Sequence, residues 1–162
     1  MLTAGHHPCQ ALADLMTMRE AFGSIEGRRL AYVGDGNNVA RSLAVLGATA
    51  GVEVAIGSPA QYTLADAHGA TLTTDPAEAV AGAHAVYADV WVSMGDEDTA
   101  DERRAALAPY RIDDALLDRG AEGAIALHCL PAHRGEEISE EVLEGRNSAV
   151  FEQAENKLYV HM

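Results

Sequence analysis

Short apolar runs alternate with amphipathic segments along the whole chain. Runs that predict β-strands lie at 29–33, 52–56, 70–72, 85–89, 124–129 and 149–151. The segments between them carry apolar residues at helical spacing, and several begin with a residue that commonly caps helices. They predict helices at 11–22, 38–51, 61–68, 76–81, 98–107, 113–117 and 140–143, with a last helix from Glu152 onward.

Strands that alternate with helices at this spacing are typical of a parallel sheet covered by helices on both faces. The sequence therefore predicts one α/β domain over residues 1–162, a three-layer αβα domain of the Rossmann-like kind with a central, mainly parallel sheet. Such sheets bind ligands at the carboxyl ends of their strands. The segments that follow strands directly, 34–39, 89–95 and 128–135, are therefore the ones expected to form a site.

Composition argues against several classes of partner. The net charge of −14 leaves no basic patch with which to bind a nucleic acid. No apolar run approaches the roughly 18 residues that a membrane span needs, and residues 1–10 lack the pattern of a signal peptide. Cys9 and Cys129 lie far apart and predict neither a disulfide nor a zinc site, so we expect a cytoplasmic protein without metal or cofactor. The acidic runs 96–104 and 136–141 are interpreted as solvated surface.

The loop 34–39, Gly-Asp-Gly-Asn-Asn-Val, joins a predicted strand to a predicted helix. Its glycines suggest a dinucleotide-binding turn, but Val39 stands in place of the third glycine and the next strand has no acidic residue at its end. A nicotinamide-dependent dehydrogenase is therefore a poor hypothesis. Asn37 and Asn38 can either cap the helix or present amide groups to a carboxylate, and both interpretations stay open.

A second strand end carries an acidic side chain. Asp89, with Ser93 four residues further on, can bind an ammonium group and a carboxylate together. Trp91 and Met94 would then supply apolar walls. The alternative is that Asp89 only caps a turn and that Trp91 only packs.

Two cysteine-containing segments remain ambiguous from the residues alone. Cys129 suggests a nucleophile, but the adjacent His128 points to the opposite face of a strand, so a buried structural thiol is the ordinary expectation. The segment 6–10, His-His-Pro-Cys-Gln, lacks the second cluster that a tetrahedral metal site requires. Its place at a helix entrance suits a carbonyl or a phosphate, unless it is only a surface turn.

Taken in order, these segments resemble the ornithine carbamoyltransferase family. The resemblance covers about 7–157 and rests on His7-Pro8-Cys9-Gln10, Gly34-Asp35-Gly36-Asn37-Asn38, Asp89-Val90-Trp91-Val92-Ser93-Met94-Gly95, His128-Cys129-Leu130-Pro131 and Ala154-Glu155-Asn156. The related aspartate enzymes share the His-Pro-x-Gln pattern, but not Ser-Met-Gly after the Asp or Cys before Leu-Pro. The resemblance implies transfer of a carbamoyl group from carbamoyl phosphate to the side-chain amine of L-ornithine, which gives L-citrulline and phosphate.

The resemblance also implies a role for each matched residue. The residues implied for ornithine are Asn38, Asp89, Ser93 and Met94. Those implied for carbamoyl phosphate are His7, Gln10, Cys129, Leu130 and Lys157. Cys129 and Asp89 are then the catalytic candidates. Because a neutral amine attacks a carbonyl, catalysis consists of positioning and charge stabilisation, and Cys129 needs no covalent intermediate.

Two features depart from the family pattern. The family's Ser-Thr-Arg-Thr phosphate loop and a further arginine are absent from the chain; in the family this loop lies in an N-terminal carbamoyl phosphate-binding domain. A neighbouring subunit of a homotrimer, or of a multiple of it, completes the family's site. Lys157 stands where the family usually has Arg, and it keeps the charge but loses the planar fork. We therefore expect an ornithine-binding domain alone, without citrulline-forming activity.

The resemblance implies a cis Leu130–Pro131 bond as well. A strand that ends at Cys129 must also turn sharply, and a cis bond reverses the chain within one residue. This bond would turn the Leu130 carbonyl toward the cleft shared by Asn38 and Asp89. An ordinary trans proline at the start of a surface loop is the alternative.

Two other functions stay open. The chain could be a non-catalytic amino-acid-binding or regulatory module that keeps the ornithine pocket. It could also serve a carbamoyltransferase for another amine or amino acid, such as putrescine or acetylornithine. The Ser93-Met94-Gly95 run counts against this last function because it matches the ornithine pattern.

Overall fold

Five parallel strands form a single sheet in a computed structural model that describes residues 3, 5–93, 95 and 97–162. Their order across the sheet is β3-β2-β1-β4-β5, so β1 lies at the centre. Every neighbouring pair is parallel. The strands are β1 Arg29–Val33, β2 Glu53–Gly57, β3 Thr71–Thr73, β4 Ala85–Ala88 and β5 Ile125–His128. Five of the predicted strands are thus confirmed, each within one residue at either end.

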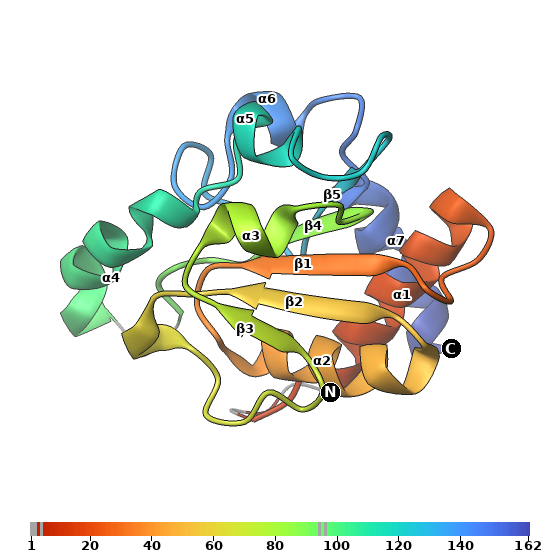
Figure 1. The fold of residues 1–162 in the computed structure, drawn as a ribbon, viewed down its shortest axis with the longest axis horizontal. Helices are drawn as coiled ribbons and strands as arrows, with labels where there is room; N and C mark the ends of the chain where they lie inside the picture. The colour runs from red at the N-terminus through yellow and green to blue at the C-terminus, as the bar shows by residue number, and fades with distance from the viewer. Residues whose placement is uncertain (1–2, 4, 94, 96) are drawn as a thin grey trace.

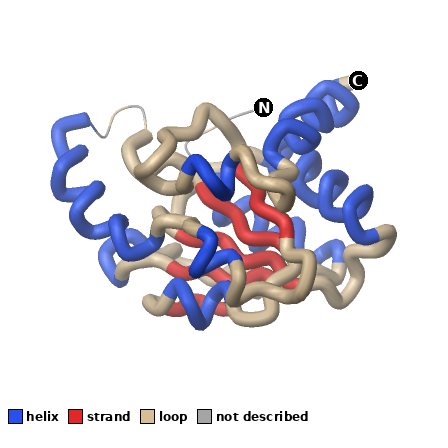
Figure 2. Tube along the Cα trace, turned by 90° about the horizontal axis from the view of Figure 1, so that it is seen from above, coloured by secondary structure: helices blue, strands red, loops and turns tan. Residues whose placement is uncertain are grey.

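Helices cover both faces of this sheet (Figures 1 and 2). Over the described ranges the helices are α1 Pro8–Phe22, α2 Asn38–Ala50, α3 Pro76–Val80, α4 Ala100–Leu107, α5 Asp114–Leu117, α6 Glu140–Leu143 and α7 Val150–His161, with 3-10 turns η1 Ala60–Tyr62, η2 Glu97–Thr99 and η3 Ala108–Tyr110. One face carries α1, α2 and α7, and the other carries α3, α5 and α6. The predicted three-layer αβα architecture is therefore confirmed. Helix α4 lies apart from both layers, beyond the carboxyl ends of the strands at the left of Figure 1.

Side chains along each strand alternate between the two faces, as the pleat requires. Tyr32 of β1 belongs to the same buried apolar cluster as Met18 of α1 and Leu43 of α2. The next residue, Val33, belongs to the cluster on the opposite face, together with Leu117 of α5. The core therefore has two halves separated by the sheet. Within the described part of the chain, no helix is long and apolar enough to cross a membrane.

The helix predicted over 61–68 is wrong. Only the turn η1 is helical there, and the chain continues as a loop. This segment packs against the loop after β1, where the Gly36 N–H donates to Tyr62 O at 2.7 Å. The approach is so close that a Cβ at Gly36 would lie 2.6 Å from that oxygen. Contact with a neighbouring loop therefore outweighs the local helical pattern.

The strand predicted over 149–151 is also wrong. The chain touches β5 through a bridge between Ser148 and Ala126, and Val150 then begins α7. The Ala149 N–H donates to Ala126 O at 2.9 Å, while Ala149 O already accepts from the Gln153 N–H at 2.9 Å. The segment therefore turns from the sheet edge directly into a helix, which begins two residues before the predicted start.

Candidate functional site

The carboxyl ends of β1, β4 and β5 lie next to one another, because these strands are neighbours in the sheet. Asp89 follows β4 directly and forms the centre of a polar cluster there. Its Oδ2 accepts a hydrogen bond from Asn37 Nδ2 at 2.6 Å, and its Oδ1 accepts from Cys129 Sγ at 2.8 Å. Oδ1 also accepts from the Val90 N–H at 2.8 Å. The Asn37–Asp89–Cys129 cluster thus joins the ends of three strands through side chains far apart in the sequence.

Cys129 is held in the cluster as a neutral thiol. Burial raises the pKa of this thiol well above its ordinary value, and the charge of Asp89 and the hydrogen bond to Asp89 raise it further. The charge of Lys157 only partly offsets these effects on the pKa of Cys129. A thiolate nucleophile requires the opposite environment. The structure therefore favours Cys129 as a hydrogen-bonding group and not as a nucleophile.

The two adjacent asparagines of the β1–α2 loop have different partners. Asn37 caps α2, since its Oδ1 accepts from the backbone N–H groups of Val39 at 2.9 Å and Ala40 at 3.2 Å. The same side chain donates to Asp89. Asn38, the residue that the family resemblance selects for ornithine, donates instead from Nδ2 to Thr3 O at 2.7 Å. The sequence showed an amide pair at a helix start but could not tell which amide faces the cluster.

The segment after Asp89 continues the strand end. Trp91 is buried, with 4% of its surface exposed, and its indole lies beside Gly34 of the β1–α2 loop. Ser93 is half-buried two residues further on. Met94, the remaining residue implied for ornithine, lies outside the described residues. Trp91 is therefore packed against the β1–α2 loop, and its role as an apolar wall for a ligand stays a prediction.

The segment after β5 has the predicted cis Leu130–Pro131 bond. Leu130 has a φ of 57°, in the left-handed region that few leucines adopt, and its N–H donates to His128 Nδ1 at 2.9 Å. Because Nδ1 accepts, the neutral ring carries its proton on Nε2, which donates to Glu137 Oε1 at 3.0 Å. That oxygen also accepts from the His133 N–H at 2.6 Å. The His128–Glu137 pair thus supports the loop that follows Cys129.

Glu137 corrects one prediction. It lies in the acidic run 136–141 that was interpreted as solvated, yet none of its surface is exposed. Its carboxylate is buried because it serves His128 and the backbone of the cis-proline loop. No local pattern separates it from Glu136, which is partly exposed and forms an ion pair with Arg104 at 3.2 Å.

Three of the residues implied for carbamoyl phosphate have different surroundings, and of these Lys157 contacts the cluster directly. His7 directly precedes α1, and its backbone N–H donates to Ser42 Oγ at 2.8 Å. Lys157 of α7 donates from Nζ to Cys129 O at 2.7 Å. Gln10 is fully buried and its Nε2 donates to Asp14 Oδ1 at 2.7 Å, so in this conformation its amide faces the core.

Asp14 is a further buried carboxyl group near the site, and sequence reasoning missed it. Its Oδ1 accepts from Gln10 and also from Gln153 Nε2 of α7 at 2.6 Å. Gln153 Oε1 accepts in turn from the His128 N–H at 2.8 Å, next to Cys129. Burial raises the pKa of Asp14 from 3.8 to about 7, although hydrogen bonds from Gln10, Gln153 and Tyr87 and the charge of Lys157 lower it.

The fold and the strand-end cluster together define an α/β domain of the Rossmann-like kind with polar groups gathered where such domains bind ligands. Residues 26–162 match the family described as "Aspartate/ornithine carbamoyltransferase, Asp/Orn binding domain". The chain belongs to this family.

Individual relatives agree with the family assignment. The ornithine carbamoyltransferase of Acidothermus cellulolyticus is 52% identical over 98% of the chain and 55% of the relative, and that of Bacillus subtilis is 46% identical over 98% and 54%. Among solved structures, ornithine carbamoyltransferase from Gloeobacter violaceus superposes with a TM-score of 0.90 at 44% identity, over 98% of this chain and 57% of that one. The Thermus thermophilus enzyme gives 0.89 at 41%, over 97% and 53%. The chain thus spans about half the length of the relatives it matches.

Proposed function

We propose that the chain is the ornithine-binding half of an ornithine carbamoyltransferase, which transfers the carbamoyl group of carbamoyl phosphate to the side-chain amine of L-ornithine. The observation that carries the proposal is the Asn37–Asp89–Cys129 cluster at three adjacent strand ends. It combines a carboxylate, which suits an ammonium group, with a neutral thiol beside it. Membership of the family and the names of its relatives support the same function.

Asp89 is the proposed contact for the α-ammonium group of ornithine. A carboxylate has about four acceptor positions, and Asn37, Cys129 and the Val90 N–H use three of those on Asp89. The fourth is left for the substrate. Ser93 would donate its hydroxyl to the ornithine carboxylate, and Asn38 and Met94 would complete the contacts to the amino-acid end.

The reaction needs a neutral side-chain amine that attacks the carbonyl carbon of carbamoyl phosphate. A C–N bond forms, the C–O bond to phosphate breaks, and the proton that the amine nitrogen loses passes to the leaving phosphate. Cys129 stays protonated in its environment and orients the amine by hydrogen bonding, so no covalent intermediate forms on the chain. Most of the rate then comes from alignment of the two substrates and from groups that stabilise the developing charge.

The carbamoyl phosphate side of the site is less complete in this chain. Leu130 would offer its carbonyl to the carbamoyl group, and Lys157 places a positive charge beside Cys129. His7 would contact the ligand from the start of α1. Gln10 must first leave its hydrogen bond with Asp14. Because no arginine-bearing phosphate loop is among these residues, we expect the chain alone to form no citrulline.

Calorimetry with L-ornithine and a citrulline assay with both substrates test the proposal together. We expect the 162-residue chain to bind L-ornithine and to show no turnover above a no-enzyme control. Addition of the remaining half of a close relative, such as the Acidothermus cellulolyticus enzyme, should restore turnover. Failure to bind ornithine would contradict the proposal. Tighter binding of putrescine or acetylornithine would mean that one of these compounds, and not ornithine, is the substrate. Binding that never leads to turnover with a competent second half would indicate a non-catalytic amino-acid module.

A further inference from the structure

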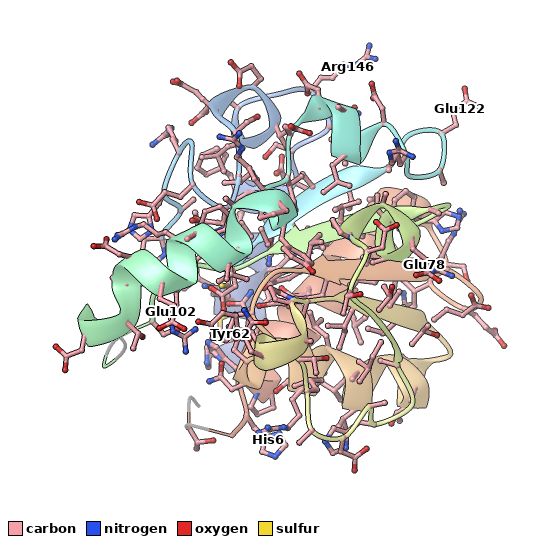
Figure 3. All side chains as sticks on the ribbon, turned by 60° about the vertical axis from the view of Figure 1, so that its left-hand side comes forward. His6, Tyr62, Glu78, Glu102, Glu122 and Arg146 are labelled. Carbon is pink, nitrogen blue, oxygen red and sulfur yellow. The ribbon has the colours of Figure 1, made fainter. Side chains whose placement is uncertain are left out.

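Arg103 of α4 connects three loops that follow different strands. Its Nη1 lies 3.0 Å from Asp35 Oδ2 in the loop after β1, and 3.5 Å from Trp91 O after β4. Its Cζ lies 4.9 Å from the ring centroid of Tyr62, in the turn after β2. Figure 3 shows Tyr62 on η1 below α4, the helix that carries Glu102. We call Arg103, Asp35, Tyr62 and Trp91 the Arg103 clasp.

The clasp is shielded from water. The side chains of Arg103 and Asp35 are only 14% and 13% exposed, so solvent screens their attraction less than that of a surface pair. A guanidinium group can donate hydrogen bonds in its plane while it stacks on an aromatic ring, and a lysine ammonium cannot do both. The position therefore depends on arginine specifically.

The next residue on the same helix provides a contrast. The side chain of Arg104 is 46% exposed and pairs with Glu136 at 3.2 Å on the surface. Arg103 and Arg104 lie on the same helix and have the same chemistry, but Arg103 contacts the loops after β1, β2 and β4, whereas Arg104 contacts Glu136 in the loop after β5. A comparison of the two arginines thus separates the clasp from a general effect of charge on α4.

The clasp also lies next to the Asn37–Asp89–Cys129 cluster along the chain. Asp35 precedes Asn37 by two residues, and Trp91 follows Asp89 by two residues. The segment 89–93 is thus held on its inner side by Asn37 and Cys129, and further along by Arg103. Ser93, the proposed partner of the substrate carboxylate, lies two residues beyond this second attachment at Trp91.

We propose that Arg103 is a positioning residue that holds the segment 89–93 over the strand ends and thereby sets the preference of the pocket for an amino acid over a plain diamine. This inference rests on the proposed function. The compound 1,4-diaminobutane (putrescine) is ornithine without its carboxylate, so it lacks the group to which Ser93 would donate a hydrogen bond. Release of residues 91–93 should therefore weaken ornithine binding, while diamine binding stays nearly unchanged because Asn37 and Cys129 still hold Asp89.

The test compares Arg103→Leu and Arg103→Lys with the matched control Arg104→Leu. Trp91 is the only tryptophan of the chain, so acrylamide quenching of its fluorescence reports the clasp directly. We expect the quenching constant to rise about twofold in Arg103→Leu, to rise less in Arg103→Lys, and to stay unchanged in Arg104→Leu. If Arg103→Leu does not fold, as judged by circular dichroism, Asp35→Asn takes its place because it removes the other half of the ion pair.

Calorimetric titrations with L-ornithine and 1,4-diaminobutane then measure selectivity. Selectivity is the dissociation constant of 1,4-diaminobutane divided by that of L-ornithine. We expect this ratio to fall about fivefold in Arg103→Leu, to recover partly in Arg103→Lys and to match the wild type in Arg104→Leu. Unchanged Trp91 quenching in Arg103→Leu, or loosened Trp91 with unchanged selectivity, would overturn the inference while the proposed function stands. A wild-type chain that does not bind ornithine would overturn the proposed function, and the selectivity assigned to Arg103 with it.

Discussion

Asp89 and Asp14 are both buried carboxyl groups close to Cys129, but their surroundings differ. Asp89 lies at the end of β4, keeps 8% of its surface exposed and accepts from a backbone N–H as well as from Asn37 and Cys129. Asp14 lies on α1 and faces α7, with none of its surface exposed, and its hydrogen bonds come from side chains. Full burial raises its pKa to about 7.

These different surroundings suit the two aspartates to different tasks. At the strand end, a carboxylate with a remaining acceptor position can receive a substrate ammonium group. Between two packed helices, the carboxyl group joins Gln10 of α1 to Gln153 of α7, and ionisation there is costly because water is excluded. Asp89 is therefore suited to bind a ligand, while Asp14 is suited to hold the helices together in its protonated form.

The largest expected effect concerns Asp14. Because the folded pKa of about 7 exceeds the ordinary value of 3.8, the folded chain holds a proton that the unfolded chain has lost between these values. The free energy of unfolding should therefore fall as pH rises from 4 through 7, by about 4 kcal/mol in total. Asp14→Asn should lack this dependence. Urea unfolding between pH 4 and 8 measures it, with the exposed Asp118→Asn as control. Parallel curves for wild type and Asp14→Asn would contradict the prediction.

A smaller effect is expected at Asp89, on binding of ornithine. Asp89→Asn should weaken ornithine binding about 30-fold, because a charge-assisted contact to an ammonium group is lost. Cys129→Ser should cost only about fivefold, since the hydroxyl can still donate to Asp89. Calorimetry on both variants, with circular dichroism to confirm folding, decides the order. Equal losses would mean that Asp89 is not the main contact for the substrate.

The smallest effect is expected at Lys157, which connects the two regions. Its charge lowers the pKa of both Asp14 and Cys129, and its Nζ donates to Cys129 O. Lys157→Met should lose stability at a higher pH than the wild type, because the pKa of Asp14 rises without the lysine charge. It should also destabilise the chain by about 1 kcal/mol. Lys157→Arg keeps the charge and should stay within about 0.5 kcal/mol of wild type. The same pH series of urea unfolding measures both variants; an identical shift in the two would show that charge is not the cause.

Much of the fold followed from local patterns. The predicted bounds of β1 agree with the structure to the residue, because an apolar run between Gly27 and Gly34 has few other options. The errors at 61–68 and 149–151 occurred where a segment lies against another part of the molecule. The first segment packs against Gly36, whose N–H donates to Tyr62 O. The second lies against β5, where the Ala149 N–H donates to Ala126 O.

The candidate site was predicted in part. Family motifs located Asp89 and Cys129, which the structure brings together, and they implied the cis Leu130–Pro131 bond. The resemblance selected Asn38, whereas Asn37 is the amide that contacts Asp89, and the role of Asn38 in ornithine binding stays a prediction. The roles of Asp14 and Arg103 had no signal in the sequence, because Asp14 depends on Gln153, 139 residues away, and Arg103 depends on Asp35, 68 residues away.

The sequence by itself determined the alternation of strands and helices and the residue types at the strand ends, because periodicity and capping act over a few neighbouring positions. Only the tertiary structure decided which strands are neighbours, and therefore which side chains meet. The order β3-β2-β1-β4-β5 places Asn37, Asp89 and Cys129 side by side, and the packing of α7 on α1 buries Asp14. Burial and proximity depend on the whole chain at once, so one aspartate lies at a strand end, where we propose that it binds a ligand, while another is buried between two helices.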